Sequence, residues 1–179
     1  EVAEHVISVE IDAKMAAAIE NTAATRAAGK KFSLVTQDAM KVTELPAEPT
    51  ALVANLPYNI SVPVLLHYLQ TFPSIRAGVV MVQAEVADRL VAGPGTKDYG
   101  IPSLKAAWWA QMSHVGVVSR SVFWPAPNVD SKLASFVRRP EPDSEEIRLI
   151  AFAAIDAAFS QRRKMLRSAL STWLGSSAR

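Results

Sequence analysis

A short apolar run, Thr50-Ala-Leu-Val-Ala54, lies between Pro49 and Pro57 and is followed at once by a helical pattern from Ser61. The run predicts a strand buried on both faces of a parallel sheet. Ser61 is expected to cap the helix, whose first turn tolerates Pro63. Ligands of open α/β sheets bind beyond the carboxyl ends of the strands. The loop from Asn55 to Tyr58 is therefore the predicted active-site loop of an α/β fold.

The chemistry available to this loop is narrow. The carboxamide oxygen of Asn55 and a nearby backbone carbonyl could accept the two N–H bonds of a planar, amino-bearing ring such as adenine, and Tyr58 could stack on that ring. Two such acceptors would favour a pyramidal, more reactive nitrogen, while Pro57 fixes the shape of the loop. Asn-Leu-Pro-Tyr can equally be an ordinary strand-to-helix turn. The tetrapeptide alone leaves both interpretations open.

The pattern outside this loop repeats strand and helix. Strands are predicted at 5–11, 31–36, 77–83, 113–119 and 133–138, and helices at 12–28, 61–70, 84–91, from Pro102 onward, and at 147–159. No helix separates the last two strands. Trp108 and Trp109 are expected in the core or an interface.

Acidic residues end two successive predicted strands. Glu10 lies where a nucleotide-binding fold places an acid that accepts hydrogen bonds from ribose hydroxyls. Asp12 is the expected helix cap, which leaves Glu10 free for this role, although a strand-end carboxylate can also be an ordinary surface charge. Asp38 follows the next strand and can equally start a turn.

Three segments together resemble one family. Asn55-Leu-Pro-Tyr-Asn-Ile-Ser61 resembles the motif of the ribosomal RNA adenine N6,N6-dimethyltransferases, which modify small-subunit (16S) rRNA with S-adenosyl-L-methionine. Ser121-Val-Phe-Trp-Pro-Ala-Pro-Asn-Val-Asp-Ser131 resembles their target-base loop, and Ala158-Phe-Ser-Gln-Arg-Arg-Lys-Met-Leu-Arg167 resembles their basic segment. The order of the three segments matches the family from about Val9 to Leu170.

The resemblance implies a Rossmann-like class I S-adenosylmethionine-dependent methyltransferase of α/β fold, with a small C-terminal helical region. We expect a catalytic domain over residues 1–140 and helices over 141–179, each incomplete in this sequence. The first strand and its glycine-rich turn are expected to precede Glu1 and to lie between the strands that end at Glu10 and Ala54. The 179 residues alone are then expected to bind the cofactor weakly.

The resemblance also implies roles for single residues. The catalytic residues would be Asn55, Leu56, Pro57, Tyr58 and Phe123, with Phe123 stacking on the target adenine opposite Tyr58 and Trp124 serving in packing. The cofactor would be bound by Glu10, Ile11, Asp38, Ala39 and Asn55. RNA phosphates would be bound by Arg162, Arg163, Lys164 and Arg167.

Charge and composition limit the partners that the protein can have. Residues 1–50 carry eight acidic and five basic side chains, whereas residues 151–179 carry one acidic and five basic, so the C-terminal end forms a basic pole. Such a pole can bind phosphates or can be a solvated face. The chain has no cysteine, its three histidines lack metal-ligand spacing, and no apolar run is long enough to cross a bilayer. We therefore expect no metal and no membrane partner.

The expected function is methyl transfer to N6 of adenosines in small-subunit rRNA, giving N6,N6-dimethyladenosine during ribosome biogenesis. The expected partner is the 30S ribosomal particle, and the protein is expected to be monomeric and cytoplasmic. Two alternatives stay open. One is a large-subunit rRNA adenine methylase that confers antibiotic resistance, and the other is a mainly non-catalytic small-subunit assembly factor.

Overall fold

A computed structural model describes residues 3–161, 164–171 and 173–175. Its elements, in chain order, are β1 (His5–Glu10), α1 (Ala13–Arg26), β2 (Lys31–Thr36), the 3-10 turn η1 (Ala39–Lys41), β3 (Ala51–Asn55), α2 (Ser61–Thr71), β4 (Ala77–Gln83), α3 (Ala84–Val91), α4 (Ile101–Trp109), β5 (Ala110–Val118), the 3-10 turn η2 (Arg120–Val122), β6 (Ser131–Arg138), α5 (Glu145–Ser160) and α6 (Leu166–Leu170). The predicted order of strands and helices is confirmed, including the final strand pair without a helix between its members. No described helix is both long and apolar enough to span a membrane.

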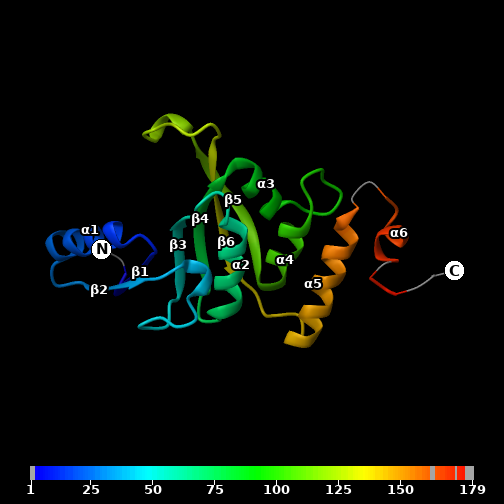
Figure 1. The fold of residues 1–179 in the computed structure, drawn as a ribbon, viewed down its shortest axis with the longest axis horizontal. Coiled ribbons are helices and arrows are strands. Elements are labelled where there is room, and N and C mark those ends of the chain that lie inside the picture. The colour runs from blue at the N-terminus through cyan, green and yellow to red at the C-terminus, as the bar shows by residue number, and fades with distance from the viewer. Residues whose placement is uncertain (1–2, 162–163, 172, 176–179) are drawn as a thin grey trace.

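The strands form two sheets. β1 and β2 pair in parallel, and a second sheet has the order β3-β4-β6-β5, in which β3 and β4 are parallel and β6 is antiparallel to both of its neighbours. Within the described part of the chain, no strand lies between β1 and β3. The β1–β2 unit with α1 lies to one side of the larger sheet (Figure 1).

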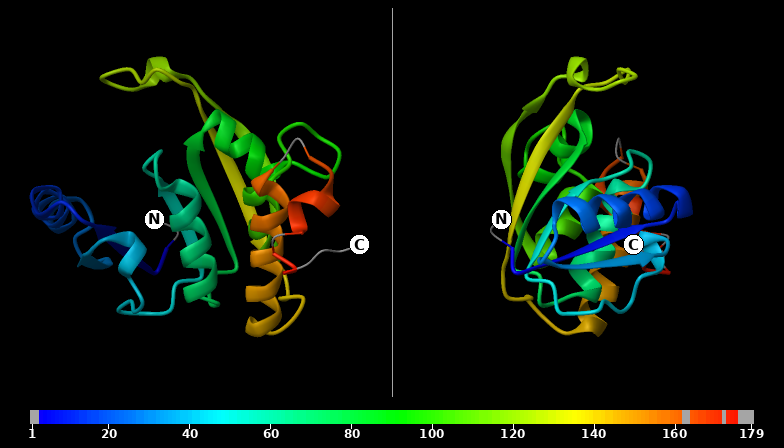
Figure 2. Two further views of the ribbon diagram at one scale, coloured as in Figure 1. Left: turned by 45° about the vertical axis from the view of Figure 1, so that its right-hand side comes forward. Right: turned by 90° about the vertical axis from the view of Figure 1, so that its left-hand side faces the viewer.

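The helices gather on one face of the four-stranded sheet (Figure 2, right). Alternate residues of β4, among them Val80 and Val82, point to that face and are buried with Phe136 of β6 against α2 and α4. Trp109 at the end of α4 is 2% exposed and meets Phe152 of α5 edge to face, which confirms its expected place in the core. This packing gives the sheet one covered and one open face.

The open face corrects the prediction for β3. Burial alternates along this strand, and Val53 is 82% exposed, so β3 is not buried on both faces. The apolar run misled because residues of both faces are apolar, while the described helices cover one face only.

Polar side chains cap two of the predicted helices at their starts. Asp12 accepts hydrogen bonds from the backbone N–H groups of Lys14 and Met15, and Ser144 accepts one from Ile147 at the start of α5. The prediction of Ser61 as such a cap is wrong, because α2 has Ile60 in that position and no side-chain cap. The Ser61 hydroxyl instead donates to the carbonyl of Tyr58, 3.4 Å away, and so ties the first turn of α2 to the loop before it.

An arginine fastens the end of α2 to the sheet. Arg138, the last residue of β6, donates from Nε to the Ile75 carbonyl at 2.7 Å and from Nη2 to the carbonyls of Leu69 and Phe72. The C-terminal carbonyls of a helix carry partial negative charge, so a guanidinium stabilises them. The loop after α2 is thereby held against the start of β4.

Candidate active site

The loop after β3 is shaped by backbone hydrogen bonds. Asn55 is the last residue of β3, and its side chain is exposed. The N–H of Leu56 continues the strand ladder by donating to the Met81 carbonyl at 3.1 Å, while the Leu56 side chain is buried in the core. The chain then turns, with the N–H of Ile60 donating to the Pro57 carbonyl at 3.2 Å. Leu56 therefore anchors the loop, and Asn55 is left at its surface.

Tyr58 is held by a residue far along the chain. Its hydroxyl lies 2.8 Å from that of Ser131, the first residue of β6, and Ser131 is 0% exposed. Asp130, just before it, receives the backbone N–H of Arg120 at 3.1 Å on its carboxylate and the N–H of Ala84 at 2.9 Å on its carbonyl. These bonds join the loop after β3 to the base of the β5–β6 hairpin.

One cavity of about 440 Å³ brings the central loop and the hairpin together. Its lining residues are Asn55, Leu56, Pro57, Tyr58, Phe123, Trp124, Pro125 and Pro127. All five predicted catalytic residues are in this set. The volume lies within the range of small-molecule sites. Aromatic rings and one carboxamide can bind a planar, amino-bearing ring by stacking and by accepting its N–H bonds.

The prediction for Trp124 is wrong. Its side chain is 98% exposed, so it does not bury an edge of the sheet. The reason is the length of the β5–β6 hairpin, whose tip extends beyond the helices (Figures 1 and 2). Phe123 is half-buried at the cavity.

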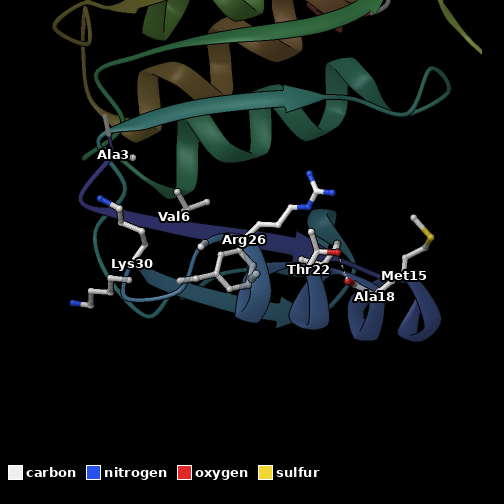
Figure 3. A pocket seen from close by; sticks show the side chains of 12 residues that line it. Ala3, Val6, Met15, Ala18, Thr22, Arg26 and Lys30 are labelled. Carbon is white, nitrogen blue, oxygen red and sulfur yellow. Dashed lines mark hydrogen bonds between the residues drawn. The ribbon is translucent and has the colours of Figure 1, made fainter. Parts of the chain in front are cut away.

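The predicted cofactor residues lie at the carboxyl ends of β1 and β2. Glu10 pairs with Thr36 in parallel register, which brings Glu10 and Asp38 to the same edge of the small sheet. Ile11 is exposed and Ala39 is half-buried in η1. None of these four lines the 440 Å³ cavity. Asn55 ends β3, which runs in the same direction as β1 and β2 (Figure 3).

Both carboxylates already have one backbone partner. Glu10 accepts the N–H of Asp12 at 2.9 Å, and Asp38 accepts the N–H of Met40 at 2.9 Å as the cap of η1. The expectation that Asp12 leaves Glu10 free is therefore wrong, because Asp12 caps α1 with its side chain while its own N–H binds Glu10. A carboxylate accepts about four hydrogen bonds, so each acid retains acceptor capacity.

A larger cavity of about 530 Å³ lies between α1 and the small sheet (Figure 3). Val6, Phe32 and the alanine-rich face of α1 line most of it, with Arg26, Lys30 and Lys31 among its polar lining residues. None of the predicted site residues is there. Its apolar walls offer nothing that would react with a substrate, so we assign no chemistry to it.

The basic segment is described only in part. Lys164 and Arg167 are exposed near the start of α6, whereas Arg162 and Arg163 lie outside the described residues. Among residues 3–161, 164–171 and 173–175, no group of three or more His, Cys, Asp or Glu side chains could hold a metal ion.

Sequence reasoning missed Ser131 as a partner of Tyr58. The residue is part of the segment that resembles the target-base loop, but a serine at a strand start carries no signal of a distant hydroxyl partner. Only the arrangement of β6 beside β4 brings the two side chains together.

The known family of ribosomal RNA adenine dimethylases matches residues 1–179. The chain belongs to this family.

Curated relatives share more than half of the residues of this chain. It is 59% identical over 178 residues to the ribosomal RNA small subunit methyltransferase A of Arthrobacter sp. (strain FB24), and the alignment covers 98% of this chain and 60% of the relative. The protein of the same name from Streptomyces coelicolor is 58% identical over 182 residues, covering 99% of this chain and 64% of the relative. The chain thus spans about three fifths of the length of these relatives.

Solved structures share the fold of this chain. A dimethyladenosine transferase from Plasmodium falciparum superposes with a TM-score of 0.76 at 24% identity, covering 94% of this chain and 60% of that one. The 23S rRNA methyltransferase ErmE superposes with a TM-score of 0.71 at 24% identity, covering 94% and 66%. The chain has the Rossmann-like α/β fold of class I methyltransferases, as predicted.

Proposed function

We propose that the protein transfers methyl groups from S-adenosyl-L-methionine to N6 of adenosines in small-subunit rRNA, giving N6,N6-dimethyladenosine. The observation that carries this proposal is the single cavity in which Asn55, Tyr58 and Phe123 meet. Membership of the adenine dimethylase family and the names of the curated relatives support the same reaction and the same RNA.

The target adenine enters the cavity between Tyr58 and Phe123. Two aromatic faces bind a base that has left its stack, and each contributes roughly 1–3 kcal/mol. The hydroxyl bond to Ser131 holds the Tyr58 side chain in place for this contact. Leu56 and Pro57 fix the turn that carries both Asn55 and Tyr58.

The carboxamide oxygen of Asn55 accepts one N–H of the target amine, and a loop carbonyl accepts the other. Both acceptors draw the nitrogen lone pair out of conjugation with the ring. The chief contribution of the protein is this orientation, which replaces a bimolecular encounter with a fixed geometry.

The carboxylates at the strand ends are hydrogen-bond acceptors that fit the proposed cofactor. Glu10 has acceptor capacity for the ribose hydroxyls, and Asp38 has it for the amine of the cofactor's adenine, with Ile11 and Ala39 beside that ring. When bound, S-adenosyl-L-methionine supplies an activated methyl group on a sulfonium, which is a good leaving group.

The reaction balances without a strong base. With the cofactor bound, the N6 lone pair would form the new carbon–nitrogen bond as the carbon–sulfur bond breaks, and N6 would then lose one proton. None of the described residues that line the cavity carries a carboxylate or an imidazole. The proton leaves to water, because the methylated amine is a strong acid until it loses that proton.

Small-subunit RNA is the better-supported target of the two RNAs considered. Curated relatives at 58–59% identity are named for the small subunit, while the large-subunit enzyme ErmE is similar in fold alone at 24% identity. We propose that the protein acts on the 30S particle as a cytoplasmic monomer, with Lys164, Arg167 and the neighbouring Arg162 and Arg163 binding phosphates. Light scattering of the purified protein measures its mass and so tests whether it is monomeric.

Methyl transfer to small-subunit particles, read by mass spectrometry of the product nucleosides, tests the function. With S-adenosyl-L-methionine in large excess, to offset the weak cofactor binding expected of these residues, the wild type is expected to form N6,N6-dimethyladenosine. Asn55→Ala is expected to form none with an unchanged melting temperature, because the Asn55 side chain is exposed. Asn21→Ala, an exposed asparagine on α1, is the matched control and should act as the wild type does.

Other outcomes would favour a different function for the protein. Product confined to large-subunit RNA would favour the resistance methylase, and particle binding without methyl transfer would favour an assembly factor. Wild-type rates for Asn55→Ala would overturn the assignment of the central loop.

A further inference from the structure

Trp124 is exposed to a degree that is unusual for tryptophan. Its side chain is 98% exposed, although tryptophan is highly buried on average. It also lines the cavity that contains Asn55 and Tyr58, so it lies at the rim of the proposed base site rather than at a remote position. A large apolar ring at such a rim is a candidate contact for a ligand that extends out of the cavity.

Backbone geometry separates Trp124 from Phe123. Phe123 has extended torsions, φ −105° and ψ 149°. In extended backbone, successive side chains point to opposite sides. Phe123 is half-buried at the cavity while Trp124 is in solvent, which agrees with this alternation. This alternation directs the two rings to opposite sides of the backbone, so Trp124 is a candidate contact for a different base from the one at Phe123.

When the target base leaves the RNA stack, the bases next to it lose a stacking partner. An adenine that enters the cavity is still bonded through its ribose phosphates to the nucleotides on either side, and these must lie at the rim. The neighbouring bases have lost a stacking partner, which is part of the cost of displacing the target. A tryptophan face at the rim can replace that partner, because every base has a π-face.

We propose that Trp124 binds the nucleobase next to the target adenosine by stacking, and so lowers the cost of displacing the target. This inference rests on the proposed function. The charge of the hairpin tip agrees with an RNA ligand, since residues 119 to 129 carry one basic side chain, Arg120, and no acidic one.

Substitution of Trp124 should change RNA binding and not chemistry. Trp124→Leu keeps an apolar side chain but removes the π-face, and it is expected to raise KM for the RNA substrate about 5- to 150-fold. The value of kcat should stay within about twofold, because Trp124 touches no reacting atom. Trp124→Phe should retain much of the affinity. Trp173→Leu, at a tryptophan near the C-terminal end that is 42% exposed, is the matched control and should have no effect.

An abasic substitution in the RNA identifies the contact. Removing the base on either side of the target should weaken binding to the wild type at one of the two positions. At that position the abasic change and Trp124→Leu should be non-additive, because each removes the same stacking pair. Additive losses at both positions would overturn the proposal.

Quenching by acrylamide tests whether the ring is available. Trp124 should be the most accessible tryptophan of the free protein, so Trp124→Phe should remove much of the quenchable signal, and RNA should protect it. If Trp124 is already shielded in the free protein, another segment or another copy covers it, and the inference is wrong.

The wild-type controls separate the two proposals. If the wild type methylates RNA and Trp124→Leu has wild-type KM, only the inference fails. If the wild type binds RNA but transfers no methyl group, the proposed function fails, and equilibrium binding of the Trp124 variants still decides the inference. If the wild type binds no RNA, both fail.

Discussion

The hydroxyl groups of Tyr58 and Ser131 lie 2.8 Å apart and connect the loop after β3 to the first residue of β6. Ser131 is fully buried, whereas Tyr58 is half-buried and lines the proposed base site. Ser131→Ala should lower the free energy of unfolding by about 1–3 kcal/mol, because it leaves the Tyr58 hydroxyl without its partner. Urea denaturation measures this loss.

The double variant provides the control. Tyr58→Phe with Ser131→Ala removes both hydroxyls, so its loss should be smaller than the sum of the single losses. Strict additivity would show that the two hydroxyls contribute nothing to each other.

Gly78 is predicted to be intolerant of any side chain. It lies in β4 between Leu52 and Phe136, and an added Cβ would meet the Leu52 carbonyl oxygen and, at 2.5 Å, the Phe136 ring. Gly78→Ala should therefore lower the free energy of unfolding by about 1–3 kcal/mol through overpacking. Gly116→Ala in β5 is the control, because nothing lies within 4 Å of its Cβ position, and it should change stability by about 0.5 kcal/mol or less. Equal losses for both would contradict the packing argument.

Acid should weaken the start of α5 through Glu145. Hydrogen bonds from Arg148, at 2.6 and 2.5 Å, lower the pKa of the Glu145 carboxyl below its usual value of 4.5. A carboxyl with a lowered folded-state pKa stabilises the fold above its unfolded-state pKa and loses this contribution as pH falls through the folded-state value. Wild type and Glu145→Gln should therefore differ most at neutral pH and converge as the pH falls below 4.5.

Arg148 gives this pair a link to the core, because it is 5% exposed and its guanidinium lies 4.8 Å from the centroid of the Phe152 ring. Melting temperatures from pH 7 downward provide the measurement. Glu146→Gln removes the same charge from the same first turn of α5 and is the matched control. A gap between Glu145→Gln and wild type that is independent of pH would contradict the prediction.

The basic segment should contribute a salt-dependent part of RNA affinity. Replacing Arg162, Arg163 and Lys164 by glutamine should weaken RNA binding and reduce the slope of log affinity against log salt by roughly 0.7–0.9 for each phosphate that the variant no longer neutralises. Glutamine at Lys14, Lys30 and Lys31 removes the same charge from the β1–β2 unit and should leave the slope nearly unchanged. An unchanged slope for the first variant would mean that the segment is a solvated face.

The sequence was sufficient for the element order, whereas the shared site of Asn55 and Phe123 was implied by the family resemblance. Strand-end positions follow from apolar runs and turn residues, and parallel strands bring their carboxyl ends to one edge. It was insufficient where exposure depends on what covers a surface. Val53 and Trp124 are both apolar and both exposed, because the helices lie on one face and the hairpin extends past them.

Local chemistry was likewise ambiguous at Ser61 and Glu10. Serine is a common helix cap, yet Ser61 is the first residue of α2, with Ile60 in the cap position, and its hydroxyl donates to the carbonyl of Tyr58 in the preceding loop. Glu10 and Asp12 are two acids near one helix start. The prediction of Asp12 as the cap is confirmed, but the bond from the Asp12 N–H to Glu10 was not predicted. Competing acceptors within a few residues are resolved only by backbone torsions.

The pairing of β6 with two strands imposes an order on folding. In the β5–β6 pair Val118 meets Ser131, 13 residues later, whereas in the β4–β6 pair Gln83 meets Ser131, 48 residues later. Closing the longer loop costs about 1 kcal/mol more in chain entropy, since each doubling of length adds about 0.6 kcal/mol. The hairpin should therefore form first and dock onto β4 as a unit. The contact between Tyr58 and Ser131, which needs both events, is then among the last parts of the molecule to assemble.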